Sequence, residues 1–198
     1  MIALRVAGAV LGVTLAVGCT PDKTVQNTEP LPAQAVGDAC GFVSQQSAEI
    51  ALGQSGLSGN GLKQDFPGTA KNPDGSKLNL AGCEFFAKDD HRLDVSVKLI
   101  GIPPYEERAV PSLLKAGGAE FVFPAAEGQG VAVAGGPGEA AATAQLIRGD
   151  WYYLVYLSKP TEGRNAVDDV VAIVRQVVNQ LGLPSVETLP RPTPTPTS

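Results

Sequence analysis

The sequence predicts a single α+β domain in which helices pack on one face of an antiparallel β-sheet. Three observations lead to this prediction. Residues Arg92 to Ile100 alternate apolar and polar side chains, which is the pattern of a half-buried strand. Ala141 to Arg148 and Trp151 to Ser158 flank Gly149-Asp150, a two-residue connection typical of a β-hairpin. Apolar residues then recur at helical spacing from Val167 to Leu181, which predicts an amphipathic helix. A sheet with helices on one face buries all of these apolar surfaces.

The elements before residue 92 follow from caps and turn residues. Ser44 is a suitable N-cap for a short helix that stops at Gly53. The next residues, up to Leu78, are rich in Gly, Asn, Asp, Ser and Pro, and they predict a long loop. Asn79 to Ala87 predicts a strand, which a polar turn joins to the alternating strand as a hairpin.

The segment between the two hairpins has weaker patterns. Pro103 to Ala116 predicts a helix that Pro111 interrupts or kinks. Glu120 to Pro124 predicts a short strand, and Gly128 to Ala132 predicts a second extended run. The last helix is expected to end at Gly182.

The first nineteen residues predict export. Arg5 is their only charge, and residues 6–17 form a short apolar core that ends at Gly18-Cys19. This is the organisation of a secretory signal peptide, and the core is shorter than the roughly 20 residues that span a bilayer. Leu15 to Cys19 reads as a bacterial lipobox, in which the Cys19 thiol receives lipid. The alternative is an ordinary cleaved signal followed by an incidental cysteine.

The cysteine count agrees with export. With Cys19 lipidated, Cys40 and Cys83 remain as an even pair in an oxidising compartment, where disulfides persist. In the chain-entropy model, a disulfide between them stabilises the fold by about 4 kcal/mol, because it closes a loop in the unfolded chain. The alternative is two buried free thiols. No Cys-x-x-Cys pair occurs and His91 is the only histidine, so the sequence predicts no metal site.

Composition divides the chain into a domain and flanking segments. Residues 20–37 and the Pro/Thr-rich end have the composition of disordered segments, and the tail is interpreted as solvated, with glycan or wall contact as the alternative. The predicted organisation is a signal peptide at 1–18, a tether at 19–37, a globular domain at 38–183 and a tail at 184–198.

Charge limits the partners. The formal net charge is −5, whereas nucleic-acid binding favours clustered Lys and Arg, so no nucleic-acid partner is expected. The acidic balance also disfavours polybasic docking to anionic lipid, so the expected membrane attachment is the covalent lipid at Cys19. The expected location is therefore the extracytoplasmic face of a cell membrane.

The sequence offers little catalytic chemistry. His91 lies in a charged turn, and no Gly-x-Ser-x-Gly elbow is present. Gly128-x-Gly130 does not open a helix, which disfavours nucleotide binding. The adjacent pairs Glu106-Glu107 and Asp168-Asp169 are expected on solvated helix faces. We therefore predict no catalytic residues and no cofactor, and a hydrolase with carboxylates from distant segments remains the least favoured alternative.

A binding module is the preferred interpretation. The second hairpin concentrates aromatic residues, with Trp151 and Tyr153 on one face and Tyr152 and Tyr156 on the other. An open face there would offer a groove for an apolar ligand, a glycan or a peptide, and residues 53–78 are a candidate lid. The alternatives are that Trp151 and Tyr153 fill the core, or that the domain docks an envelope protein through a sheet edge.

These patterns together resemble the actinobacterial lipoproteins of the domain-of-unknown-function 3558 type. The resemblance covers roughly residues 38–181 and implies an α+β fold and a lipid-anchored location, without implying a reaction. The chain differs from the family pattern at Ser47 and Val131. The motifs that carry the resemblance are Cys40 before the Ser44 cap and Gly53, Cys83-Glu84-Phe85, Gly128-Gln129-Gly130, the Arg148-Gly149-Asp150 turn and the closing helix.

Overall fold

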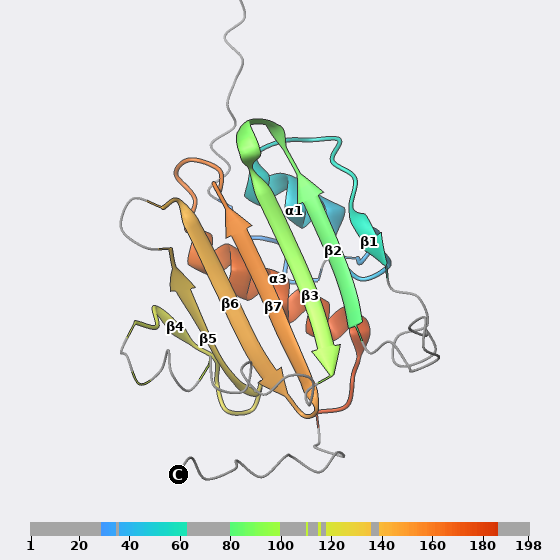
Figure 1. Ribbon diagram of the computed structural model, residues 1–198, viewed down its shortest axis with the longest axis vertical. Coiled ribbons are helices and arrows are strands. Elements are labelled where there is room, and N and C mark those ends of the chain that lie inside the picture. The colour runs from blue at the N-terminus through green and yellow to red at the C-terminus, as the bar shows by residue number, and fades with distance from the viewer. Residues whose placement is uncertain are drawn as a thin grey trace, which may run out of the picture.

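The hairpin predicted over residues 141–158 forms the middle of the sheet (Figure 1). The computed structural model describes residues 29–34, 36–62, 80–99, 110, 115, 118–135 and 139–185. Within them, seven strands pair antiparallel in one sheet, in the order β1-β2-β3-β7-β6-β5-β4. The strands are β1 (Asn60–Leu62), β2 (Leu80–Phe86), β3 (Arg92–Leu99), β4 (Phe121–Val122), β5 (Gln129–Ala134), β6 (Ala141–Arg148) and β7 (Trp151–Ser158). The predicted α+β class is confirmed.

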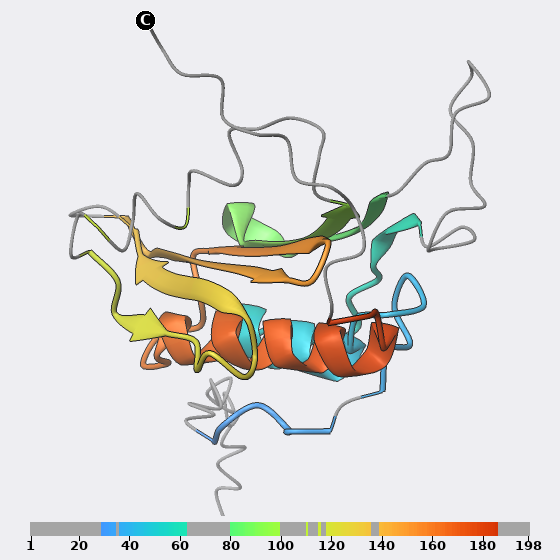
Figure 2. The ribbon, with the colours of Figure 1, turned by 90° about the horizontal axis from the view of Figure 1, so that it is seen from below.

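Both described α-helices lie on one side of the sheet (Figure 2). Helix α1 (Gln45–Leu52) begins where Ser44 Oγ accepts the backbone N–H of Ser47, and it ends at Gly53 in the left-handed region. Helix α3 (Ala166–Leu181) begins where the Asn165 side chain accepts the N–H groups of Val167 and Asp168. These caps satisfy N–H groups that have no partner within the helix. The predicted starts and stops of both helices are confirmed.

The side of the sheet that faces the helices, which we call the helix face, is the main core. Alternate residues of the central strands point into it, as the period of a strand requires. The buried apolar side chains of α1 and α3 pack against them. The strand residues of this core are Ala81, Cys83, Phe85, Leu93, Val95, Val97, Ala132, Ala142, Ala144, Leu146, Trp151, Tyr153, Val155 and Leu157.

On the other side of the sheet, which we call the opposite face, the described residues form an apolar cover at one end. There, Val110 packs on Val131, Ile147 and Tyr152 in a second, smaller apolar cluster. The far end of this face carries Phe86, which is 56% exposed. The helix predicted over residues 103–116 lies outside the described residues, apart from Val110 and Lys115.

Two segments differ from their predictions. The long loop predicted after Gly53 contains β1, whose Gly61 pairs with Cys83 of β2. The sequence Asn-Gly-Leu has no alternation, so this strand depends on its neighbour rather than on its own pattern. Residues 63–79, which complete the predicted loop and lid, lie outside the described residues.

The second difference is at the end of the predicted tether. Residues 29–34 and 36–37, the N-terminal strap, lie along the outer side of the helices (Figure 2). Leu31 is buried in the main core. The carbonyls of Glu29 and Pro32 accept hydrogen bonds from Arg164 and Gln176. The domain therefore begins about nine residues before position 38. The segment is held by the burial of its own Leu31 side chain and by the hydrogen bonds from Arg164 and Gln176.

Candidate functional site

Two of the four aromatic residues proposed for binding belong to the core. Trp151 and Tyr153 lie on the helix face, and the side chain of Tyr153 is only 1% exposed. This is the arrangement of the alternative interpretation, in which the two rings fill the core with Val155 and Leu157. They are therefore not available as a surface platform.

The other two aromatic residues lie on the opposite face in different surroundings. Tyr152 is 4% exposed beneath Val110, so the open row of Tyr152 and Tyr156 that the alternation suggests is wrong for Tyr152. Strand alternation predicts which face a residue joins, but the cover over that face comes from a distant segment. Tyr156 is half-buried, and its neighbours across the strands are Asp94 and Thr143.

A polar cluster lies next to Tyr156 on this face. Arg92 Nε is 2.7 Å from Asp94 Oδ2, and Arg92 Nη2 is 3.6 Å from Glu84 Oε1. The Arg92 guanidinium also lies 5.4 Å from the centre of the Phe86 ring. Burial raises the pKa of Asp94, and the hydrogen bond from Arg92 only partly offsets this. Glycosidases hold two carboxylates on opposite sides of a scissile bond. Here Glu84 and Asp94 are side by side on β2 and β3 and share one guanidinium, which favours a structural role.

A cavity of about 210 Å³ lies on the helix face of the sheet, between the end of β6 and α3. In Figure 2 the turn that precedes β5 comes down against this helix. The walls therefore come from three segments that are far apart in the sequence. The lining residues are Glu127, Leu146, Arg148, Arg175, Val178 and Asn179.

One wall of the cavity is an ion pair between α3 and the turn. Arg175 donates from Nε and Nη2 to the two carboxylate oxygens of Glu127, at 2.9 and 3.0 Å. This hydrogen bonding raises the pKa of Arg175, and the guanidinium lies 5.2 Å from the centre of the Phe121 ring. A bidentate pair that also stacks on an aromatic ring fixes the direction of its remaining donors.

The opposite wall contains Arg148, which has one donor without an acceptor among the described residues. Arg148 donates from Nη1 to the Glu127 carbonyl at 3.2 Å, whereas its buried Nε has no partner in the part of the chain that the structure describes. The buried Tyr153 hydroxyl likewise has no partner among the described residues. Tyr153 pairs in register with Leu146 of the cavity wall but does not itself line the cavity. Burial raises the pKa of Tyr153 to about 12, so the hydroxyl stays protonated at neutral pH.

Two glycines bring the turn close to β6. A side chain at Gly128 would collide with the Ile147 carbonyl, and one at Gly130 would lie 2.6 Å from the Gln145 carbonyl and 2.8 Å from Leu146. Gly128 also has a φ of 134°, which residues with a side chain rarely adopt. The Gly-x-Gly segment therefore fixes the position of Glu127 beside Arg148 and Arg175.

The sequence interpretation missed this cavity. The sequence places Arg148 at the end of a strand, directly before the hairpin turn, and gives no sign that it lines a cavity. In this turn Gly149 has a positive φ of 58°, as a primed turn requires. Asp150 is buried, so the Arg-Gly-Asp triplet is not presented at the surface. Arg175 and Asn179, one helical turn apart, are the only local signal, because they mark where the polar edge of α3 meets the sheet.

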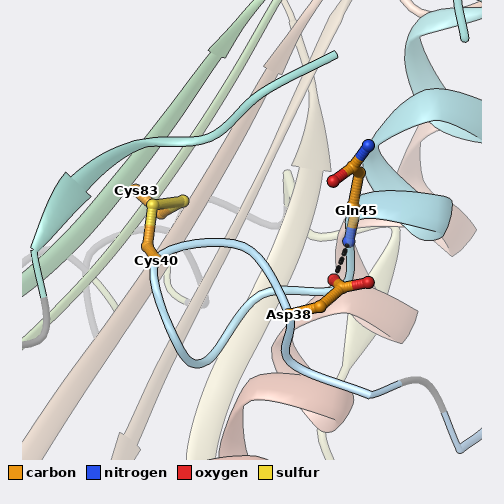
Figure 3. Close-up of a disulfide and its surroundings, with 4 residues drawn as sticks. All are labelled: Asp38, Cys40, Gln45 and Cys83. Atoms are coloured by element: carbon orange, nitrogen blue, oxygen red, sulfur yellow. Dashed lines mark hydrogen bonds between the residues drawn. A yellow bond between two sulfur atoms is a disulfide. The ribbon is translucent and has the colours of Figure 1, made fainter. Parts of the chain in front are cut away.

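The predicted disulfide is confirmed. Cys40 and Cys83 are bonded, with their Cα atoms 5.8 Å apart, so the loop before α1 is tied to β2 (Figure 3). Asp38, at the start of this loop, accepts the backbone N–H of Gln45 at 2.7 Å and adds a negative charge at the N-terminus of α1. The disulfide thus holds the first helix over the edge of the sheet.

Other predicted features can be placed only in part. Cys19 and the signal peptide lie outside the described residues, as do residues 186–198 of the tail. No helix in the described ranges is long and apolar enough to cross a membrane. The described residues also contain no group of three potential metal ligands. No protein-family model, curated protein or solved structure matches the chain.

Proposed function

We propose that the chain is a lipid-anchored protein of the cell envelope, held at Cys19 on the extracytoplasmic face of the membrane. The Cys40–Cys83 disulfide is the observation that supports this location most directly, because disulfides persist in oxidising compartments. The bond also accounts for two of the three cysteines and leaves Cys19, at the end of the signal-like segment, as the one available for lipid. The resemblance to the domain-of-unknown-function 3558 lipoproteins is part of the same proposal.

The domain itself is proposed to bind a ligand rather than to catalyse a reaction. The cavity beside α3 supports this, because two guanidinium groups, of Arg148 and Arg175, line a partly enclosed space. General acid–base catalysis requires a group that exchanges a proton near the working pH. Arg175 and Tyr153 instead have pKa values raised above their ordinary range, so both keep their protons at neutral pH.

A second candidate is an accessory protein that docks an envelope partner through the end of the opposite face that carries Phe86. The exposed Phe86 ring beside Arg92 favours this candidate. Addition of a partner strand at a sheet edge is less favoured, because the edge strands β1 and β4 have three and two residues.

The location is tested by changing Cys19 to Ala and following the protein in membrane and soluble fractions of cells fed a labelled fatty acid. Wild-type protein is expected in the membrane fraction with label, whereas Cys19→Ala should carry no label and should accumulate as precursor or soluble protein. The double variant Cys40→Ala/Cys83→Ala is the matched control, since it removes the other two thiols and should keep the label. A Cys19→Ala protein that remains labelled and membrane-bound would exclude the lipid anchor.

A further inference from the structure

We propose that the cavity between β6 and α3 binds the carboxylate group of a small organic acid with a short aliphatic part. This inference rests on the proposed binding role of the domain and names the site and the chemical class of the ligand. It depends on the charge of the cavity, on the unpaired donor of Arg148 and on the size of the cavity.

The charge of the cavity favours a ligand with one negative charge. Two guanidinium groups, of Arg148 and Arg175, line it together with one carboxylate, of Glu127. That carboxylate already accepts two hydrogen bonds from Arg175. The excess of one positive charge lies on the side of Arg148, in a chain whose net charge is −5. A monoanion neutralises this excess, whereas a phosphate group of charge about −1.5 to −2 exceeds it.

The donors favour a planar acceptor group. Arg148 uses Nη1 on the Glu127 carbonyl, and its buried Nε is without a partner among the described residues. A guanidinium binds the two oxygens of a carboxylate through parallel hydrogen bonds. A buried donor without an acceptor destabilises a fold, and a bound carboxylate oxygen would remove that penalty.

The size and the apolar walls define the rest of the ligand. The cavity, at about 210 Å³, is smaller than the roughly 300–1,000 Å³ of pockets that enclose drug-sized ligands. Leu146 and Val178 supply an apolar surface next to the guanidinium groups. A short aliphatic chain attached to a carboxylate matches both walls. The carboxylate can belong to a free acid or to the end of a peptide chain.

In the test, the folded protein is titrated with four probes at millimolar concentrations. Binding is monitored through amide chemical shifts in two-dimensional NMR spectra. Butyrate represents a free acid and N-acetylalanine represents a chain end. Butyramide has the shape of butyrate without its charge, and inorganic phosphate is an anion of another shape and charge. Saturable shifts at residues 127, 148 and 175 are expected with butyrate, N-acetylalanine or both, and weak or absent shifts with the other two. The better of the two carboxylates identifies the source.

Three variants locate the site. Arg148→Gln is expected to weaken carboxylate binding about tenfold or more, as loss of a charge-assisted hydrogen bond does. Tyr153→Phe, which changes a buried neighbour outside the cavity lining, should leave binding nearly unchanged while the domain stays folded. Arg92→Gln is the matched control, because it removes an arginine from the opposite face and should leave binding unchanged. Circular dichroism on each variant separates loss of binding from loss of folding.

Several results overturn the inference. The absence of carboxylate binding by the folded wild-type domain would do so, as would equal binding of butyramide or a preference for phosphate. Binding that survives in folded Arg148→Gln would place the site elsewhere. The lipid anchor is tested separately through Cys19, so failure of the carboxylate titration leaves that part of the proposed function intact. Native mass spectrometry of protein purified from its producing cells tests the binding role separately from the ligand class. A bound molecule that is not a carboxylate would overturn the ligand class and leave the binding role intact.

Discussion

On the helix face, each central strand contributes apolar residues to the main core, and buried apolar side chains of α1 and α3 pack against them. The opposite face of the same strands is divided. One end carries Tyr152 and Ile147 beneath Val110, and the other carries the Arg92–Asp94 ion pair and the exposed Phe86. A strand with a regular alternation can therefore have a uniform face on one side and two unlike environments on the other.

This difference separates two kinds of information. Alternation of apolar and polar residues assigns each side chain to a face, because successive residues of a strand point to opposite sides. What lies over that face depends on segments elsewhere in the chain. The two candidate sites lie where the described residues leave the sheet less covered: the end of the opposite face that carries Phe86, and the cavity where α3 meets the end of β6.

The largest effect on stability is expected at the N-terminal end of α3, where a buried ion pair joins Arg164 to the helix. Arg164 and Asp169 form an ion pair whose side chains are both only 4% exposed. Asp169→Asn leaves a buried guanidinium without its counter-charge and is expected to lower the free energy of unfolding by about 3–5 kcal/mol. Asp168→Asn, at the neighbouring exposed position, changes the same helix end and should cost less than about 1 kcal/mol. Chemical denaturation of both variants measures the difference, and equal losses would show that the burial of Asp169 has no energetic consequence.

A second comparison separates the two ends of the opposite face. Tyr152→Ala removes a buried ring from the cluster with Val110 and is expected to destabilise the domain by about 3 kcal/mol. Tyr156→Ala removes a half-buried ring at the less covered end and should cost about 1 kcal/mol. Thermal unfolding of the two single variants measures these values. Equal midpoints for the two variants would mean that Val110 does not cover Tyr152 in solution.

The smallest change in the free energy of unfolding at neutral pH is expected at Tyr153. Its buried hydroxyl has no partner in the described chain, so Tyr153→Phe should raise the free energy of unfolding by about 1 kcal/mol without ligand. The pKa of this group rises from 10.0 to about 12 on folding. The stabilisation linked to its proton is therefore complete below pH 10 and is lost as the pH rises towards 12.

The corresponding measurement is urea unfolding of wild type and Tyr153→Phe at pH 8 and at pH 11 to 12. The advantage of the phenylalanine variant should grow by about 1–2 kcal/mol across this range, because the pKa rises from 10.0 to about 12 and the linkage is complete only above pH 12. A difference between the two proteins that does not change with pH would contradict the burial of an ionisable hydroxyl at this position.

Local patterns were sufficient for most of the fold. The alternation from Arg92 onward, the Gly149-Asp150 turn and the helical spacing after Val167 each depend on neighbouring residues, and the structure has each of them at the predicted place. The caps at Ser44 and Gly53 are local in the same sense. The cysteine pairing follows from the count of three once Cys19 is set aside for lipid in an exported chain.

The remaining features depend on contacts between distant segments. Asp169 was expected on a solvated face, but Arg164, which precedes the helix, folds back on it. The cavity joins Glu127, Arg148 and Arg175, which no local spacing connects. Strand β1 and the cover of Tyr152 depend on a partner strand and on Val110. Signals of this kind lie in the tertiary arrangement and not in any window of the sequence.

The N-terminal strap sets how far the domain can travel. Hydrogen bonds to the Glu29 and Pro32 carbonyls hold the strap on the outer side of α3. With Cys19 lipidated, only about ten residues, 19–28, separate the lipid from the first held residue. A chain of this length reaches at most about 35 Å when fully extended. The cavity would thus sample only a thin layer of solvent above the headgroups, and the molecules that it can capture are those that enter this layer.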